Sequence, residues 1–225
     1  MALPRAPGKR AWGSPALLPA RPDVTLGARA IEEAIIDLPP GLQDMPEACQ
    51  LLYEHWSEIR GDALVPSRAG IDPGQLRSIL PYLQIVEVIR PSLIRCKLSG
   101  TALRDLFGFD LTGRNMIDLT PPEQRRQRGW RYWVGTTQPC GCLFGGKLRF
   151  LSGALAPYLG LVLPLRPSQE GGPMLAISAI ALIRNQGWIN ERSQPALNLA
   201  EYVTFLDIGA GIPDRTDPPD DWVME

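Results

Sequence analysis

The sequence contains a single histidine, His55, among its 225 residues. This scarcity limits the available chemistry, because serine and cysteine nucleophiles commonly depend on a histidine base and haem is commonly held by a histidine ligand. His55 stands beside Trp56 in a predicted helix without an orienting partner, so we expect it on a helix surface or at an interface. The sequence therefore disfavours histidine-dependent catalysis and a haem held by histidine; no catalytic residue is assigned, and any cofactor stays unknown.

Cysteine is also sparse: four residues are too few for a disulfide framework in a chain of this length. Cys140 and Cys142 stand one residue apart, and two such thiolates could share a metal or form a redox pair. A tetrahedral zinc site would need two further ligands, which only Cys49, Cys96 or His55 could supply as soft donors. We favour small buried or loop thiols and no metal site; a thiol-dependent metal or redox protein is the alternative.

Long apolar runs and a charge imbalance are both absent. The longest apolar stretch, Ala154 to Leu165, is broken by Pro157 and Pro164 and is shorter than the about 18 residues needed to span a bilayer. The N-terminus lacks the apolar core of a secretory signal. A formal net charge of -1 gives no general attraction to nucleic acid or anionic membranes. We therefore expect a cytoplasmic protein that neither spans a membrane nor binds nucleic acid.

Composition divides the chain into three parts. Residues 1–40 are rich in proline, alanine and arginine, and this composition predicts a mostly disordered arm. Residues 41–186 carry the periodic apolar patterns of an ordered domain. Residues 187–225 end in an acidic stretch, which predicts a solvated tail with room for a short helix.

Two helices are predicted from start signals and apolar periodicity. Asp44-Met45-Pro46-Glu47 has the form of a capping box with proline in the first turn, and Leu52, Trp56 and Ile59 then recur at helical spacing. This stripe must be buried by its own domain or by a partner. A second capping box, Thr120-Pro121-Pro122-Glu123, starts a helix to about Thr136.

The second helix has two contrasting sides. We expect Arg125, Arg126, Arg128 and Arg131 on its exposed side and Trp130, Trp133 and Val134 on its apolar side. The arginines could pair with phosphates or an acidic partner, but a solvated helix face is the favoured interpretation, since no glycine-rich phosphate loop accompanies them.

Short strands surround these helices. The β-branched run at 85–89 and the alternating run at 94–98 predict two strands joined by a proline turn. A short strand is predicted at 148–150, and two apolar runs, 158–165 and 174–183, predict a hairpin. A capped helical run at 101–107, closed by Gly108, lies between the two groups of strands. The order indicates an α+β domain whose antiparallel sheet has helices on one side.

Several short segments follow one another in order through the ordered region: Leu52-Tyr53-Glu54-His55-Trp56, Pro66-Ser67-Arg68, Leu80-Pro81-Tyr82-Leu83, Leu98-Ser99-Gly100-Thr101, Asp110-Leu111-Thr112-Gly113-Arg114 and Leu163-Pro164-Leu165. In this order and spacing the sequence resembles small stand-alone bacterial PAS-like domains. The likeness covers residues 50–185 approximately. The resemblance implies a five-stranded antiparallel sheet, an N-terminal helix packed outside it, and a cavity between the sheet and small helices. It also implies sensing, partner binding or localisation in a signalling pathway rather than catalysis.

Candidate site residues follow from this resemblance. We place Thr101, Arg104 and Arg114 near the mouth of the cavity and Trp130 and Trp133 among its lining as ligand-binding residues. The helical stripe of Leu52, Trp56 and Ile59 is the candidate interface for a signalling partner or a homodimer. The first hypothesis is a non-enzymatic sensor or adaptor that binds a small molecule, and the second is a ligand-free interaction or dimerisation module with a filled core.

Overall fold

The computed structural model describes residues 44–150, 155–182 and 199–225. The chain divides into two units, 1–36 and 37–225, and all described residues belong to the second. The predicted N-terminal arm at 1–40 and the start of the predicted tail at 187–198 lie outside the described residues.

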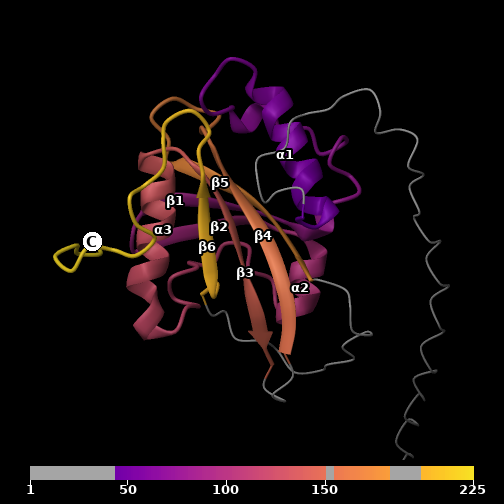
Figure 1. The fold of residues 1–225 in the computed structure, drawn as a ribbon. Coiled ribbons are helices and arrows are strands. Elements are labelled where there is room, and N and C mark those ends of the chain that lie inside the picture. Colours follow the sequence, from indigo (N-terminus) through magenta and orange to yellow (C-terminus); the bar gives the residue numbers. More distant parts are fainter. Residues whose placement is uncertain (1–43, 151–154, 183–198) are drawn as a thin grey trace, which may run out of the picture. The chain divides into compact units, whose positions relative to one another are not determined.

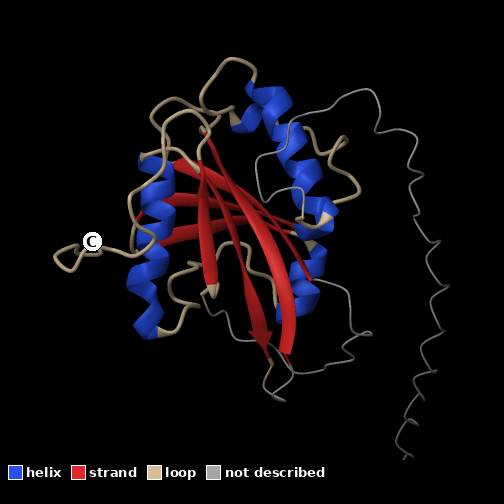
Figure 2. Ribbon diagram, viewed as in Figure 1, coloured by secondary structure: helices blue, strands red, loops and turns tan. Residues whose placement is uncertain are grey.

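The described part of the chain is built on a six-stranded antiparallel sheet (Figure 2). The strands stand in the order β2-β1-β5-β4-β3-β6. The α+β class with an antiparallel PAS-like sheet is confirmed, although the sheet has six strands instead of the five expected. The strands are β1 (Leu83–Arg90), β2 (Leu93–Ser99), β3 (Gly141–Arg149), β4 (Leu155–Leu165), β5 (Met174–Leu182) and β6 (Tyr202–Leu206).

Alternate residues of each central strand face opposite sides of the sheet, as the two-residue period requires. In β4, Leu161, Leu163 and Leu165 join the core on one side. Between them, Val162 packs against the core on the other side. Both faces are therefore covered, which explains why these strands read as nearly continuous apolar runs in the sequence.

Helix α1 (Glu47–Arg60) covers the first face of the sheet, opposite to α3 (Figure 1). It begins after Pro46, and the predicted capping box does not form, because no side chain bonds the free N–H groups of its first turn. Gly61 ends it with a φ of 51°, a positive value that glycine adopts at little cost.

The predicted exposed stripe of α1 is part of the core. Leu52 and Trp56 are fully buried, and Ile59 packs against the same cluster. The Trp56 indole Nε1 donates a 2.8 Å hydrogen bond to the carbonyl of Pro164 in β4. The expected interface was therefore wrong for Leu52 and Trp56: the apolar spacing was recognised correctly, but this domain itself buries the stripe.

His55 is likewise buried, contrary to its expected surface position. The backbone N–H of Asp72 donates to His55 Nε2 at 3.2 Å. Because Nε2 accepts, Nδ1 carries the proton and donates to Gln75 Oε1 at 3.0 Å. The only histidine of the chain therefore fixes the 72–75 turn to α1.

The second face is covered by α2 (Thr101–Phe107), the loop that follows it, and α3 (Arg125–Thr137). Gly108 closes α2 with a φ of 74°, as predicted. Helix α3 begins after a turn of 3₁₀ helix, Pro122–Gln124, and Thr120 does not cap it. The Thr120 hydroxyl instead donates 2.7 Å to the carbonyl of Met116.

The region expected to be an acidic tail contributes to the fold. Strand β6 pairs with β3, with Phe205 opposite Cys142. The following segment, residues 207–225, reaches α3, where the Trp222 ring meets Trp130 edge-on at 5.3 Å. The described part of the predicted tail, 199–225, contains no helix. The acidic composition of this region gave no indication of strand β6 or of the contact between Trp222 and Trp130.

Two glycines of α3 provide a matched test of how closely this helix packs. A Cβ on Gly129 would lie 2.6 Å from the Pro91 carbonyl oxygen, whereas one on Gly135 would meet only Cys140 Sγ, at 3.9 Å. We expect Gly135→Ala to stabilise by about 0.5–1 kcal/mol through helix propensity. We expect Gly129→Ala to destabilise by about 1–3 kcal/mol through overpacking. Urea unfolding of both variants measures the difference; equal effects would contradict the close approach at Gly129.

Burial of Trp56 makes a second stability prediction. Trp56→Ala should cost about 3–5 kcal/mol because it leaves a cavity in the core. Trp56→Phe should cost less but remain destabilising, because the Pro164 carbonyl loses its donor. Chemical denaturation checks both. If Trp56→Ala were as stable as the wild type and lost only self-association, the result would support an exposed interface on α1 instead of a buried Trp56.

Candidate functional site

A cavity of about 140 Å³ lies between the second face of the sheet and α3. Its walls come from every strand except β2, from α2 and from the loop after α2. The lining is largely apolar, with leucine, phenylalanine, valine and isoleucine side chains predominating. This is the cavity that the family resemblance led us to expect, between sheet and helices.

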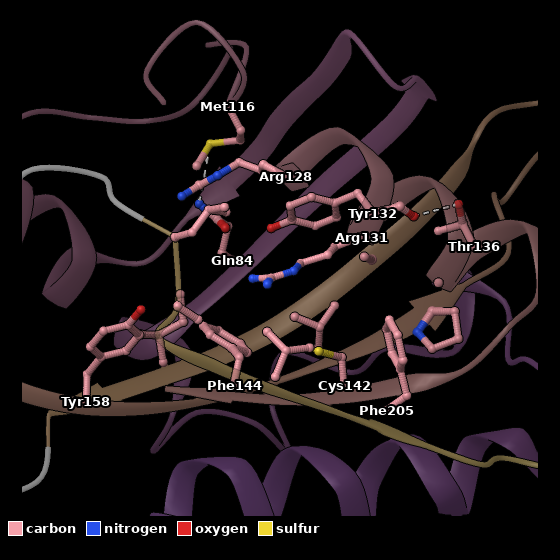
Figure 3. A pocket seen from close by; sticks show the side chains of 18 of the residues that line it. Gln84, Met116, Arg128, Arg131, Tyr132, Thr136, Cys142, Phe144, Tyr158 and Phe205 are labelled. Carbon is pink, nitrogen blue, oxygen red and sulfur yellow. Dashed lines mark hydrogen bonds between the residues drawn. The ribbon is translucent and has the colours of Figure 1, made fainter. Parts of the chain in front are cut away.

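Helix α3 contributes one continuous face to the cavity. Its lining residues are Arg128, Arg131, Tyr132, Gly135 and Thr136, which follow the i, i+3, i+4, i+7, i+8 pattern of a single helical stripe. Figure 3 shows Arg128, Arg131 and Tyr132 reaching from the helix toward the strands. The Thr136 hydroxyl donates to backbone carbonyls of its own helix, so the arginines and the tyrosine supply the polar groups of this stripe.

The opposite wall adds polar groups from the sheet. Gln84 in β1 is only 3% exposed, and its Nε2 contacts two sulfur atoms, Cys96 Sγ at 3.8 Å and Met116 Sδ at 3.9 Å. Sulfur is a weak acceptor, so this buried amide has not found strong partners. Tyr158 in β4 lines the same space with its ring against Phe144, and both are labelled in Figure 3.

The cavity is electrostatically one-sided. Two guanidinium groups line it, and among the described lining residues there is no carboxylate. Burial lowers the pKa of Arg128, and the nearby charge of Arg131 lowers it further. Burial also raises the pKa of Tyr158 to about 12, so its hydroxyl stays neutral near pH 7. The site thus presents positive charge and hydroxyl groups within apolar walls.

Arg131 also contacts the segment at 207–225. Its Nη2 lies 3.5 Å from Asp217 Oδ1, and its Nε donates to the Thr216 carbonyl at 3.3 Å. The Asp217 side chain is 65% exposed, so solvent screens this ion pair. Arg126, one turn earlier on the outer face of α3, donates to the carbonyls of Pro219, Asp220 and Trp222.

None of the five predicted ligand-binding residues lines the cavity. Thr101 is exposed in the first turn of α2, and Arg104 is exposed and pairs with Asp105 at 3.6 Å. Arg114 is exposed over the ring of Phe109. Trp130 and Trp133 are half-buried and pack into the cores on either side of the cavity-facing stripe.

The cavity residues that the sequence prediction does not assign lie on α3. The sequence predicts a solvated face for the arginines of this helix and an apolar side for its tryptophans, whereas Arg128 and Arg131 line the cavity. The signal that could have found the stripe is its helical spacing, since Arg128, Arg131 and Tyr132 share one face. Gln84 gave a second signal, as a polar residue within an otherwise apolar strand.

The cysteine pair lies on the cavity wall. Cys140 and Cys142, which have the two-residue spacing of one strand face, both line it. Burial raises the pKa of each thiol to about 12, which disfavours the thiolate needed for nucleophilic or metal-binding chemistry. Within residues 44–150, 155–182 and 199–225, no group of three or more His, Cys, Asp or Glu side chains is arranged to hold a metal ion.

Comparison with known proteins identifies the family. The sequence profile described as PAS domain matches residues 45–176, more than half of the chain, and the chain belongs to this family. The match extends from α1 into β5 and so contains α2, α3 and most of the cavity wall. No curated protein matches the chain. In the described segments, no helix has both the length and the apolar character to cross a membrane.

The raised thiol pKa values predict slow alkylation. At pH 8 we expect Cys140 and Cys142 to react with iodoacetamide at least about a hundredfold more slowly than a free thiol, because the thiolate is the reactive form. The rate should continue to rise about tenfold per pH unit above pH 9, where the rate of a free thiol has levelled off, because the folded pKa is about 12. Site-resolved mass spectrometry of the labelled protein measures this. Labelling at the rate of a free thiol would favour the redox interpretation.

Proposed function

We propose that this protein is a non-enzymatic sensor or adaptor of a bacterial signalling pathway, which binds a small molecule in the cavity between its sheet and α3. The observation that carries the proposal is a largely apolar cavity with a few convergent polar side chains, the usual composition of a small-molecule site. Membership of the PAS domain family supports a role in sensing or interaction. A cytoplasmic homodimer that acts on a signalling partner belongs to the same proposal.

A sensor needs a path from its ligand to its partner, and two contacts offer one. Pro164 lines the cavity while its carbonyl accepts the hydrogen bond of Trp56, so β4 joins the cavity to α1. Arg131 lines the cavity and also contacts Asp217, so α3 joins it to the segment at 207–225. Either path carries a signal only if the ligand binds two arrangements of that element with different affinity.

The second candidate is a ligand-free interaction module, and the small size of the cavity favours it. Ligand sites commonly measure about 300–1,000 Å³. A volume of about 140 Å³ is well below that range. In this case the cavity is a packing imperfection of the core, and the output of the protein is a contact with another protein.

Native mass spectrometry of freshly purified protein separates the two candidates. We expect the native mass to exceed the denatured mass by a small non-covalent adduct. Gly135→Leu should abolish the adduct, because Gly135 lines the cavity and the leucine side chain would fill it. Thr137→Leu, an exposed position of the same helix, is the matched control and should retain the adduct. A folded wild-type protein that never carries an adduct would support the interaction module.

A further inference from the structure

The walls of the cavity restrict the size and the character of a ligand. Leu106, Phe107, Phe144 and Val162 line the space with carbon atoms, which suits a ligand with an apolar body. The volume of about 140 Å³ is close to that of an engineered apolar cavity of about 150 Å³ that binds benzene. A molecule about the size of a single ring is therefore expected.

The charged groups at the cavity already have partners. The described lining contains no carboxylate, but Arg131 Nη2 lies 3.5 Å from an oxygen of Asp217, a residue outside the lining. Arg128 has an interaction partner as well. Burial raises the pKa of Tyr158 and of the Cys142 thiol to about 12, so both groups are neutral near pH 7. A ligand carboxylate would leave water without meeting an unpaired positive charge, a cost that a neutral ligand avoids.

The amide of Gln84 is a buried donor with weak acceptors. Among the described residues, its Nε2 contacts Cys96 Sγ at 3.8 Å and Met116 Sδ at 3.9 Å. Sulfur accepts hydrogen bonds weakly, and a buried N–H group without a strong acceptor costs free energy. Gln84 and Met116 both line the cavity, so a ligand can reach the amide there. An oxygen atom of a ligand is the stronger acceptor that this wall lacks.

Helix α3 offers donors to the same oxygen atom. Figure 3 shows Tyr132 and Arg131 extending from the helix toward the strand that carries Gln84. A carbonyl oxygen has two lone pairs, so it can accept from Gln84 Nε2 and from one donor of the helical stripe. One acceptor atom is therefore enough to use the polar part of the cavity, while the rest of the ligand lies against carbon.

We infer that the cavity binds a neutral molecule of single-ring size that carries one carbonyl oxygen, and that this oxygen accepts a hydrogen bond from Gln84. The inference rests on the proposed function, because it assumes that the cavity is a ligand site. The apolar walls bind the ring. The amide of Gln84 positions the oxygen and discriminates against analogues that have no acceptor, since these leave the amide with its sulfur partners.

A ketone and a hydrocarbon of the same shape test the role of Gln84. The full-length protein, extensively dialysed, is titrated calorimetrically with cyclohexanone and with methylenecyclohexane, in which a CH₂ group replaces the oxygen. The ratio of the two dissociation constants is compared between the wild type and Gln84→Met. We expect the preference for the ketone to fall about tenfold in Gln84→Met, because the donor is lost while an unbranched side chain still fills its place.

Thr136→Val is the matched control. Thr136 lines the cavity, but its hydroxyl already donates to carbonyls of its own helix. This variant should keep the wild-type preference within about twofold. In both variants, binding of methylenecyclohexane within about twofold of the wild type shows that the cavity is intact. An unchanged preference in Gln84→Met, or an equal fall in Thr136→Val, would overturn the assignment of the oxygen to Gln84.

An anion of similar size tests the charge of the ligand. Cyclobutanecarboxylate should bind the wild-type protein about tenfold more weakly than cyclohexanone, because its charge must leave water for a site whose cationic groups already have partners. Equal or tighter binding of the anion would overturn the neutral ligand class. This measurement needs no variant, so it holds even where Gln84→Met fails to fold.

The cavity-filling variant distinguishes failure of the inference from failure of the proposed function. Gly135→Leu should block all three probes, because the leucine side chain would fill the cavity. If neither neutral probe bound but the native adduct was present and vanished in Gly135→Leu, the ligand class would be wrong and the sensor function would stand. If neither probe nor adduct was ever bound by the folded wild-type protein, both would be wrong.

Discussion

The contact between α3 and the turn joining β1 to β2 is the constraint on which the site depends. The helix backbone at Gly129 lies so close to the Pro91 carbonyl that a Cβ would stand 2.6 Å from that oxygen. This contact fixes the height of α3 over the sheet. Farther along the helix the packing is less close, because a Cβ on Gly135 would lie 3.9 Å from Cys140 Sγ. Both residues line the cavity there.

The second constraint is that helices cover both faces of the sheet. The core under α1 buries Leu52 and Trp56 completely, while the core under α3 contains the cavity. Pro164 belongs to both, because its ring lines the cavity and its carbonyl binds Trp56. A shift of β4 caused by a ligand would therefore be felt by α1 through a hydrogen bond rather than through loose packing.

Sequence patterns predicted the three described α-helices and most of the sheet but not the face of α3. The two-residue alternation of 94–98 and the apolar runs of β4 and β5 are local signals that the structure confirms. The strand predicted at 148–150 covers only the end of β3, and β6 was not predicted. The prediction for α3 was wrong because binary patterning assigns charged side chains to solvent, whereas Arg128 and Arg131 line a cavity. The partners of Arg126 are carbonyls more than 90 residues away in the chain, between 219 and 222, and no local pattern specifies them.

The cavity itself could not be derived from any one segment, since it exists only where α3, α2 and the strands fail to fill the space between them. Strand β6 is different, because Tyr202-Val203-Thr204-Phe205-Leu206 is rich in residues that favour strands, and only the acidic residues after it concealed the signal.

Arg131 is the residue where cavity and surface meet. Its present acceptors, the exposed Asp217 carboxylate at 3.5 Å and the Thr216 carbonyl at 3.3 Å, are both long contacts, and solvent screens the first. A polar group of a ligand inside the cavity would meet the same guanidinium in a less polar environment, where polar interactions are stronger. The segment at 207–225 would then keep its hydrogen bonds with Arg126 and the packing of Trp222 against Trp130, but it would lose its contact with Arg131. A ligand that competes for one side chain in this way has the differential affinity that a sensor requires.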